Sequence, residues 1–331
     1  MALRNLVTDI AGIRVGHAAD ATLGTGVSVL VFDQPAVASV DIRGGGSGTR
    51  ETALLDPAQT VEGIDAIVLS GGSAFGLDAA SGVQAFLREQ GRGFAVRSAR
   101  VPIVPAAILF DLFSRGSDNS AQWGQYPPYR ELGYDAAKSA SAECALGSIG
   151  AGTGATTVSL KGGIGAASAQ TRDGVVVSAI AAVNAAGSVT IGDTAHFWAA
   201  PFEVGAEFGG RGWPQRFPDN AISFRSKGAA GQNTTLAVVV TDAILTKAQC
   251  HRLAVMAQSG LSRAIYPVHT PLDGDVVFAA ATGAKALRDP VFSLSELGAA
   301  AANVLARAVA RSVYEAKAIP GGPKAYRDMF G

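Results

Sequence analysis

The sequence has few of the residues that build disulfide scaffolds or metal centres. Its 331 residues include only two cysteines, Cys144 and Cys250, and four histidines. The cysteines are far apart and belong to no C-x-x-C pair, which favours buried free thiols over a disulfide framework or a zinc site. No two histidines have the H-x-x-x-H or H-E-x-x-H spacing, so we expect neither a metal nor a cofactor.

Charge is also scarce, and the two signs balance. Lys and Arg together number 27, as do Asp and Glu, and charged residues make up 16% of a chain that is 48% hydrophobic. The lack of a basic excess argues against a nucleic-acid partner. A low charge content predicts much buried surface, either in a thick core or between the subunits of a homo-oligomer.

Long apolar runs are missing too. No uncharged stretch reaches the length of a membrane span, and Arg4, Asp9 and Arg14 interrupt the segment where a signal peptide would need an apolar run. We therefore expect a cytoplasmic protein that does not contact a membrane.

What the chain does contain is short β-branched runs, glycine-rich turns and helical patterns in alternation, which predicts stacked layers of sheet and helix. Segments 27–33 and 36–42 are β-branched and flank Gln34-Pro35, which predicts a hairpin. Segment 64–70 is a continuous apolar run, typical of a buried strand, and it leads into a helix expected to end at Gly91.

The second half of the chain holds a long segment without periodicity. Residues 201–233 are rich in Gly and Pro and predict a loop, and a loop of that length is usually functional or disordered. Directly after it, 234–243 predicts a strand and 245–265 an amphipathic helix. A further helix is expected over 130–147, ended by Gly147, and the tail from residue 321 is expected to be a loop.

The junction between this loop and the following strand, Asn233-Thr234, is compatible with self-cleavage. If the Thr234 hydroxyl attacks the Asn233 carbonyl, the acyl group moves from nitrogen to oxygen and the ester then hydrolyses. The freed amine of Thr234 would have an ordinary pKa of about 7.7–8.0, so it could act as general base for its own hydroxyl. The alternative is that Asn-Thr simply begins a strand.

Motifs along most of the chain bear on this choice: DIAGIRVGH (9–17), SVDIRGGGSGTRET (39–52), IDAIVLSGGSAFGLDAASGV (64–83), VPIVPAAILFDL (101–112), GSIGAGTGATT (147–157), AAVNAAGSV (181–189), NTTLAVVVTDA (233–243) and PVHTPLDGD (267–275). In these motifs the sequence resembles the P1 family of autoprocessing peptidases, which includes L-aminopeptidase/D-esterases, β-peptidyl aminopeptidases and nylon-oligomer endo-hydrolases. The resemblance implies an α/β fold, a four-layer α/β/β/α sandwich of the N-terminal-nucleophile-hydrolase type. It also implies one domain, 1–331, cut into a large fragment 1–233 and a small fragment 234–331, and a homo-oligomer, with a tetramer favoured.

Within that family, the pattern here is similar to the nylon hydrolases. The aminopeptidases cut before a serine and carry Ser-x-Glu downstream, whereas this chain has threonine and Asp273-Gly274-Asp275. The resemblance maps the nucleophile to Thr234, the amine-orienting carboxylates to Asp273 and Asp275, a supporting lysine to Lys161 and an amide donor to Asn184.

Each mapped role has a physical reason and an alternative. An aspartate could hold the Thr234 ammonium, Lys161 could favour the neutral amine and stabilise negative charge, and Asn184 could donate to an oxyanion. Alternatively, Lys161 is a solvated turn residue, Asn184 a strand cap, and Asp273-Gly274-Asp275 an Asp-Gly turn. A tyrosine of the segment 126–134, Tyr126, Tyr129 or Tyr134, could line the pocket.

The expected reaction is amide hydrolysis through an acyl-enzyme on Thr234, with linear ω-amino-acid amides such as 6-aminohexanoate oligomers as substrates. One alternative is an aminopeptidase that releases N-terminal residues from small peptides. A second is an unprocessed binding or scaffold protein. A third is a serine hydrolase that uses Ser73 and a histidine, although Gly71-Gly72-Ser73-Ala74-Phe75 lacks the last glycine of G-x-S-x-G.

Overall fold

One long strand, β2 (Thr25–Ile42), organises the sheet of this protein. Its first half pairs with β1 (Ile13–Asp20), its last residues pair with β11 (Val276–Lys285), and β4 (Gly63–Ser70) runs along its other edge. The computed structural model describes residues 3–227 and 233–331. In this part of the chain nine strands form one mixed sheet, in the order β3-β7-β4-β2-β11-β10-β9-β8 with β1 on β2.

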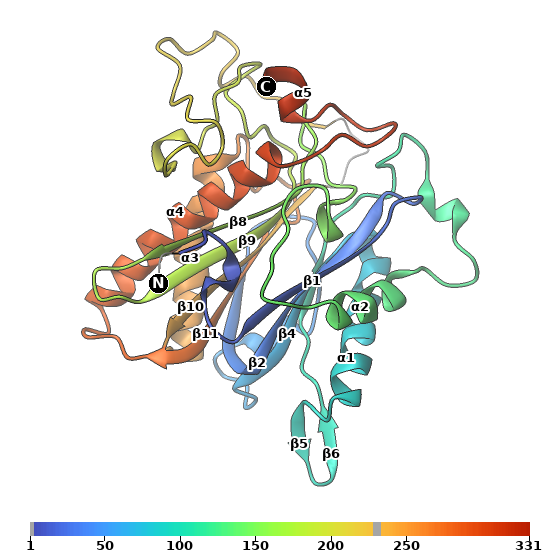
Figure 1. The fold of residues 1–331 in the computed structure, drawn as a ribbon, viewed down its shortest axis with the longest axis vertical. Coiled ribbons are helices and arrows are strands. Elements are labelled where there is room, and N and C mark those ends of the chain that lie inside the picture. Colours follow the sequence, from blue (N-terminus) through green and yellow to red (C-terminus); the bar gives the residue numbers. More distant parts are fainter. Residues whose placement is uncertain (1–2, 228–232) are drawn as a thin grey trace.

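The remaining elements complete this sheet or flank it. The other strands are β3 (Gly48–Arg50), β5 (Phe94–Val96), β6 (Ala99–Val101), β7 (Ala106–Ile108), β8 (Ile164–Gln170), β9 (Val176–Asn184) and β10 (Thr234–Ala243). The helices are α1 (Ala79–Glu89), α2 (Tyr129–Lys138), α3 (Lys247–Ala264), α4 (Phe292–Tyr314) and α5 (Tyr326–Phe330). Strands β5 and β6 form a separate hairpin that projects from the body (Figure 1).

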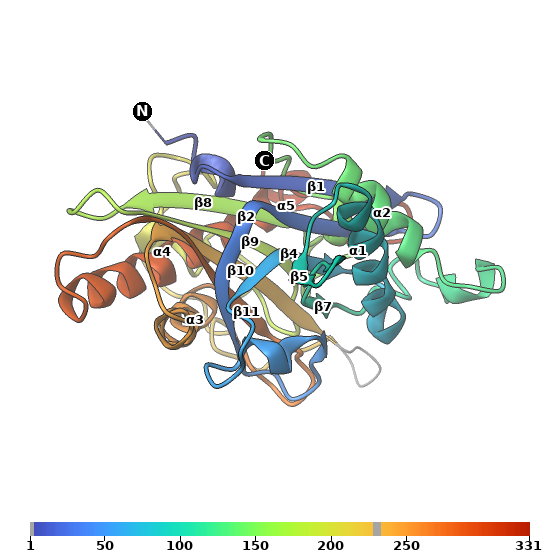
Figure 2. The same ribbon diagram turned by 90° about the horizontal axis from the view of Figure 1, so that it is seen from below.

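Successive side chains along the strands point to opposite faces, and the apolar ones form three clusters. Three clusters between packed elements separate four layers of structure. In β10, Ala237 and Val239 pack with helices α3 and α4, whereas Leu236 and Val238 face a central cluster shared with β2, β4, β8, β9 and β11. A third cluster joins the opposite face of β2 and β4 to α1 and α2. Figures 1 and 2 show α3 and α4 on one side of the strands and α1 and α2 on the other. The predicted α/β/β/α arrangement is therefore confirmed.

The hairpin predicted over 27–42 is wrong, because these residues form one continuous strand. Asp33, Gln34 and Pro35 are exposed, and the pairing of β2 with β4 shifts register between Val31 and Ala36. Proline lacks the N–H that a regular ladder needs, so an irregular position of this kind tolerates it. With this irregularity, one continuous strand pairs with β1 along its first part and with β11 along its last part.

Other sequence predictions fare better. Strand 64–70, strand 234–243 and helix 245–265 are confirmed as β4, β10 and α3. Helix α2 is shorter than predicted, since it ends at Lys138, and the tail contains the short helix α5. Both cysteines are buried and free, as expected. Among the described residues, no helix is long and apolar enough to cross a bilayer.

Strand β10 lies inside the sheet, antiparallel to β9 and parallel to β11. The expected loop 201–233 has only the 3₁₀ turn Ala200–Phe202 as regular structure over its described part, residues 201–227 and 233. Residues 228–232 of that prediction lie outside the described residues. The predicted loop is therefore followed directly by the first residue of a central strand.

Candidate active site

The first residue of β10 carries a hydroxyl directed at the preceding peptide group. Thr234 Oγ1 donates to the carbonyl oxygen of Asn233 at 2.6 Å, and the backbone N–H of Gly274 donates to the same oxygen at 2.6 Å. Both Asn233 and Thr234 are buried. The Gly274 N–H polarises this carbonyl toward negative charge, as an oxyanion-hole donor does, and the Thr234 hydroxyl lies beside the same group. The sequence did not single out Gly274 as a donor.

Gly274 also has to be a glycine at this position. A Cβ added there would lie 2.5 Å from Thr234 Oγ1 and 2.9 Å from the carbonyl oxygen of Gly46. Any side chain would therefore displace the hydroxyl or the strand end. The Asp-Gly-Asp spacing permits this close approach, with a carboxylate on each side.

Asp275 ties the start of strand β10 to the neighbouring turn. One carboxylate oxygen accepts from the N–H of Thr235 at 2.7 Å, and the other accepts from the backbone N–H of His269 at 3.1 Å and from its ring Nδ1 at 2.8 Å. The Asp275 side chain is 1% exposed. His269, a residue that sequence reasoning did not assign to the site, has a backbone φ of +56°. The Asp275 contacts fix the backbone directly after Thr234.

Asp273 lies on the other side of Gly274 and is equally buried. Its carboxylate accepts from the N–H and Oγ1 of Thr270, at 2.9 and 2.8 Å, and from the N–H of Ala186 at 3.1 Å. Burial raises the pKa of Asp273, and the negative charge of Asp275 raises it further, while the hydrogen bonds from Thr270 and Ala186 oppose this. The structure thus brings both predicted carboxylates to the Asn233-Thr234 junction.

Asn184 ends β9 and is the register partner of Thr234. Its Oδ1 accepts from the N–H of Thr156 at 3.0 Å and from Lys227 Nζ at 3.0 Å, and its Nδ2 donates to the carbonyl of Phe110 at 2.9 Å. The predicted amide donor therefore stands beside the predicted nucleophile. Its role toward an oxyanion stays a prediction.

Lys161 is completely buried, so the alternative of a solvated turn residue is wrong. Its Nζ donates to three carbonyls, those of Gly152, Ala155 and Gly162, at 2.6–2.8 Å. Burial lowers the pKa of Lys161 to about 7, and the negative charge of Asp111 opposes that shift. The lysine thus holds the 152–162 segment in place. Its role in supporting a nucleophile stays a prediction.

A cavity of about 350 Å³ adjoins these groups, and its lining includes Asp111, Thr156, Asn184, Lys227 and Asn233. Asp111 is buried, with one oxygen accepting from Thr25 Oγ1 at 2.7 Å and the other from the N–H of Gly72 at 2.7 Å. Burial raises the pKa of Asp111 to about 6. Sequence reasoning missed both Asp111 and Lys227, because neither stands out in the composition of its surrounding segment.

Comparison with known proteins now decides the family. The model of peptidase family S58 matches residues 5–325. The chain belongs to peptidase family S58. An uncharacterized aminopeptidase of Mycobacterium tuberculosis is 44% identical over 347 residues, covering 98% of each chain. A 6-aminohexanoate-oligomer endohydrolase of Kocuria sp. is 28% identical and covers 83% of this chain and 74% of its own.

The fold has a solved counterpart as well. The L-aminopeptidase D-Ala-esterase/amidase of Ochrobactrum anthropi, described as a variant of the Ntn hydrolase fold, superposes with a TM-score of 0.69 at 19% identity, over 94% of this chain and 86% of that one. The resemblance inferred from the motifs is therefore confirmed. This S58 peptidase is a hydrolase that acts on amide bonds.

The three candidate tyrosines of this S58 peptidase differ in position. Tyr129 is fully buried, with its hydroxyl 3.3 Å from Thr25 Oγ1, behind Asp111. Tyr126 is 76% exposed, and Tyr134 donates to Glu89 at 2.8 Å. Among the described residues that line the cavity, none is a tyrosine.

The histidine contacts do not support the alternative of a serine hydrolase built on Ser73. In the described part of the chain, the ring nitrogens of the four histidines have hydrogen bonds to Ser28, Gly212, Val40 and Asp275, and none to Ser73. The same residues contain no cluster of three or more His, Cys, Asp or Glu side chains that could hold a metal ion.

Proposed function

We propose that this protein is a self-cleaving amide hydrolase whose nucleophile is Thr234, released as a new N-terminus by scission after Asn233. The observation that carries the proposal is the contact of Thr234 Oγ1 with the Asn233 carbonyl, together with the Gly274 N–H on the same oxygen. A hydroxyl and an oxyanion donor therefore converge on one buried peptide group, as nucleophilic catalysis requires.

In this proposal self-cleavage proceeds in two steps, an acyl shift and an ester hydrolysis. Oγ1 of Thr234 adds to the Asn233 carbonyl carbon, the C–N bond breaks, and the hydroxyl proton ends on the released amine, which leaves an ester. Water then hydrolyses the ester, which leaves Asn233 with a carboxylate and restores the hydroxyl of Thr234, whose amine is already free. In turnover this amine takes the proton of Oγ1 while the hydroxyl attacks the substrate amide, and water later hydrolyses the acyl-enzyme.

Two substrate classes are supported by different observations. Threonine with Asp273 and Asp275 is the pattern that favours linear ω-amino-acid amides, such as 6-aminohexanoate oligomers. The 44% identity to an uncharacterized aminopeptidase, against 28% to the endohydrolase, favours release of N-terminal residues from small peptides. We place the aminopeptidase activity first, because the more similar relative spans nearly the whole of both chains.

Intact-mass analysis of the purified protein tests the nucleophile. We expect two fragments, 1–233 and 234–331, and a single intact chain for Thr234→Ala. Thr235→Val is the matched control, because the buried Thr235 hydroxyl has no hydrogen-bond partner in the described part of the chain, and it should cleave normally. A wild-type chain that stays intact on long incubation would refute the proposal and favour a binding or scaffold protein.

Product analysis then separates the substrate classes. Incubation with short peptides should release free N-terminal amino acids, whereas internal cuts in 6-aminohexanoate oligomers would assign the endo-hydrolase activity instead.

A further inference from the structure

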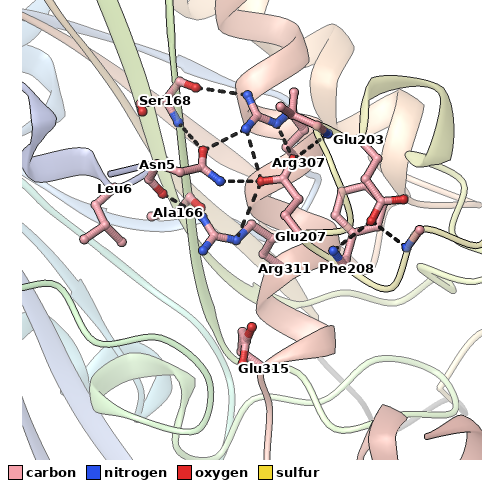
Figure 3. Close-up of polar contacts among 12 residues, drawn as sticks. Asn5, Leu6, Ala166, Ser168, Glu203, Glu207, Phe208, Arg307, Arg311 and Glu315 are labelled. Atoms are coloured by element: carbon pink, nitrogen blue, oxygen red, sulfur yellow. Dashed lines mark hydrogen bonds and ion pairs between the residues drawn. The ribbon is translucent and has the colours of Figure 1, made fainter. Parts of the chain in front are cut away.

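Two groups of charged contacts help to anchor the long loop that precedes the proposed cleavage site. Glu207 forms a buried ion pair with Arg307 of α4 at 2.6 Å, and Arg311 lies 3.8 Å from the same carboxylate (Figure 3). Further along, Arg225 pairs with Asp193 at 2.5 Å, and Asn220 donates to that carboxylate at 2.9 Å. The second anchor lies only two residues before Lys227, so it fixes where this lysine enters the cavity wall.

Lys227 is directed at the amide of Asn184. Its Nζ lies 3.0 Å from Oδ1 and 3.4 Å from the backbone carbonyl oxygen of the same asparagine. Thr156 adds its N–H at 3.0 Å and its Oγ1 at 3.5 Å, so three donors contact Oδ1. An amide that accepts hydrogen bonds at one end must present its NH₂ group at the other, and in the described part of the chain the Phe110 carbonyl accepts one of its two N–H groups.

We propose that Lys227 is a positioning residue that locks the Asn184 side chain with an N–H available to the oxyanion in the cavity. Lys227 adds to the contacts with Thr156 and Phe110 that already oppose a flip of this amide, and a flipped Oδ1 would repel a negatively charged oxygen. The long loop then has a defined task, which is to bring a cation onto an asparagine that the sheet has already placed beside Thr234.

The electrostatic setting of Lys227 agrees with this assignment. Burial lowers its pKa to about 7, Asp273 favours the charged form, and Lys161 disfavours it. Lys227 can hydrogen-bond Asn184 Oδ1 in either protonation state, so the positioning contact persists across neutral pH.

The proposal rests on the proposed function and is tested after it, on protein whose self-cleavage has been established by mass. Lys227→Ala, Lys227→Arg and the control Lys138→Ala, an exposed lysine of α2, are compared in self-cleavage and in hydrolysis of an amino-acid p-nitroanilide. We expect Lys227→Ala to lower the self-cleavage rate and kcat at least 10-fold with KM within about 3-fold, since loss of one oxyanion donor costs up to about 10²–10³ in rate. Lys227→Arg should restore much of the loss, and the control should match wild type.

A double-mutant cycle isolates the route through Asn184. If Lys227 acts by positioning that amide, Lys227→Ala should change the self-cleavage rate less than 2-fold in an Asn184→Ala background. Additive effects would overturn the proposal, as would a raised KM with unchanged kcat, which would place Lys227 on the substrate instead. A thermal melt of each variant verifies folding. If wild type fails to cleave, the proposed function falls; if wild type cleaves and Lys227→Ala matches it, only this inference falls.

Discussion

Replacing Asp275 with asparagine should weaken both the fold and self-cleavage by an amount that its contacts define. The carboxylate accepts three N–H groups, from Thr235 on one oxygen and from the backbone and ring of His269 on the other. Asparagine has one acceptor oxygen, so its NH₂ group must face a donor whichever way it turns. The less costly orientation keeps both His269 contacts and leaves the buried Thr235 N–H unsatisfied, at about 1–3 kcal/mol.

This loss has two readouts. The melting temperature should fall by about 1.5–4 °C, since an unfolding entropy of about 2.1 cal/mol/K per residue makes 1 kcal/mol worth roughly 1.4 °C in a chain of 331 residues. If the same free energy is missing from the transition state, self-cleavage should slow by about 5- to 150-fold, which a time course of intact mass measures. Asp219→Asn, at an exposed position, is the matched control. A variant with wild-type melting and wild-type cleavage would show that Asp275 does not hold the strand that carries Thr234.

Two further predictions concern stability alone. Glu207→Ala leaves Arg307 and Arg311 without their buried carboxylate and should lower the free energy of unfolding by about 3–5 kcal/mol. Denaturant titration measures this loss, with Glu62→Ala at an exposed position as the control. Equal stability of the two variants would contradict the prediction. Burial lowers the pKa of His17 from 6.5 to about 4, so the unfolded chain binds more protons between these values and stability is lost as pH falls from 6.5 toward 4, by on the order of 3 kcal/mol. His17→Gln should flatten this part of the stability–pH curve, and an unchanged slope would rule out His17 as the titrating group.

The start of β10 was predictable because its pattern is local. An apolar β-branched run begins at Thr234 directly after a glycine-rich loop, and the structure places the strand at the same residues. The continuous strand β2 was not predictable in this way. Gln34-Pro35 is a normal turn signal, and only the packing of two sheet halves onto one strand overrides it.

The candidate site likewise contains residues that the sequence could predict and groups that only the structure reveals. The motif resemblance pointed to Thr234, Asn184, Asp273 and Asp275, and these residues do converge in space. The Gly274 N–H is a backbone group, which no side-chain pattern reveals. Lys227 lies in a segment without periodicity, and only the three-dimensional path of the loop brings it onto Asn184. Asp111 is recognisable as a cavity residue only once burial and the Thr25 contact are known.

The order of the strands has a consequence for a chain cut after Asn233. Strands β10 and β11 of the small fragment would be inserted between β9 and β2 of the large one. Separating the fragments would break the backbone hydrogen bonds between β9 and β10 and between β11 and β2. It would also expose four unpaired strand edges, which promote aggregation. Scission would therefore yield two polypeptides that stay in one sheet, and the small fragment made alone should be insoluble.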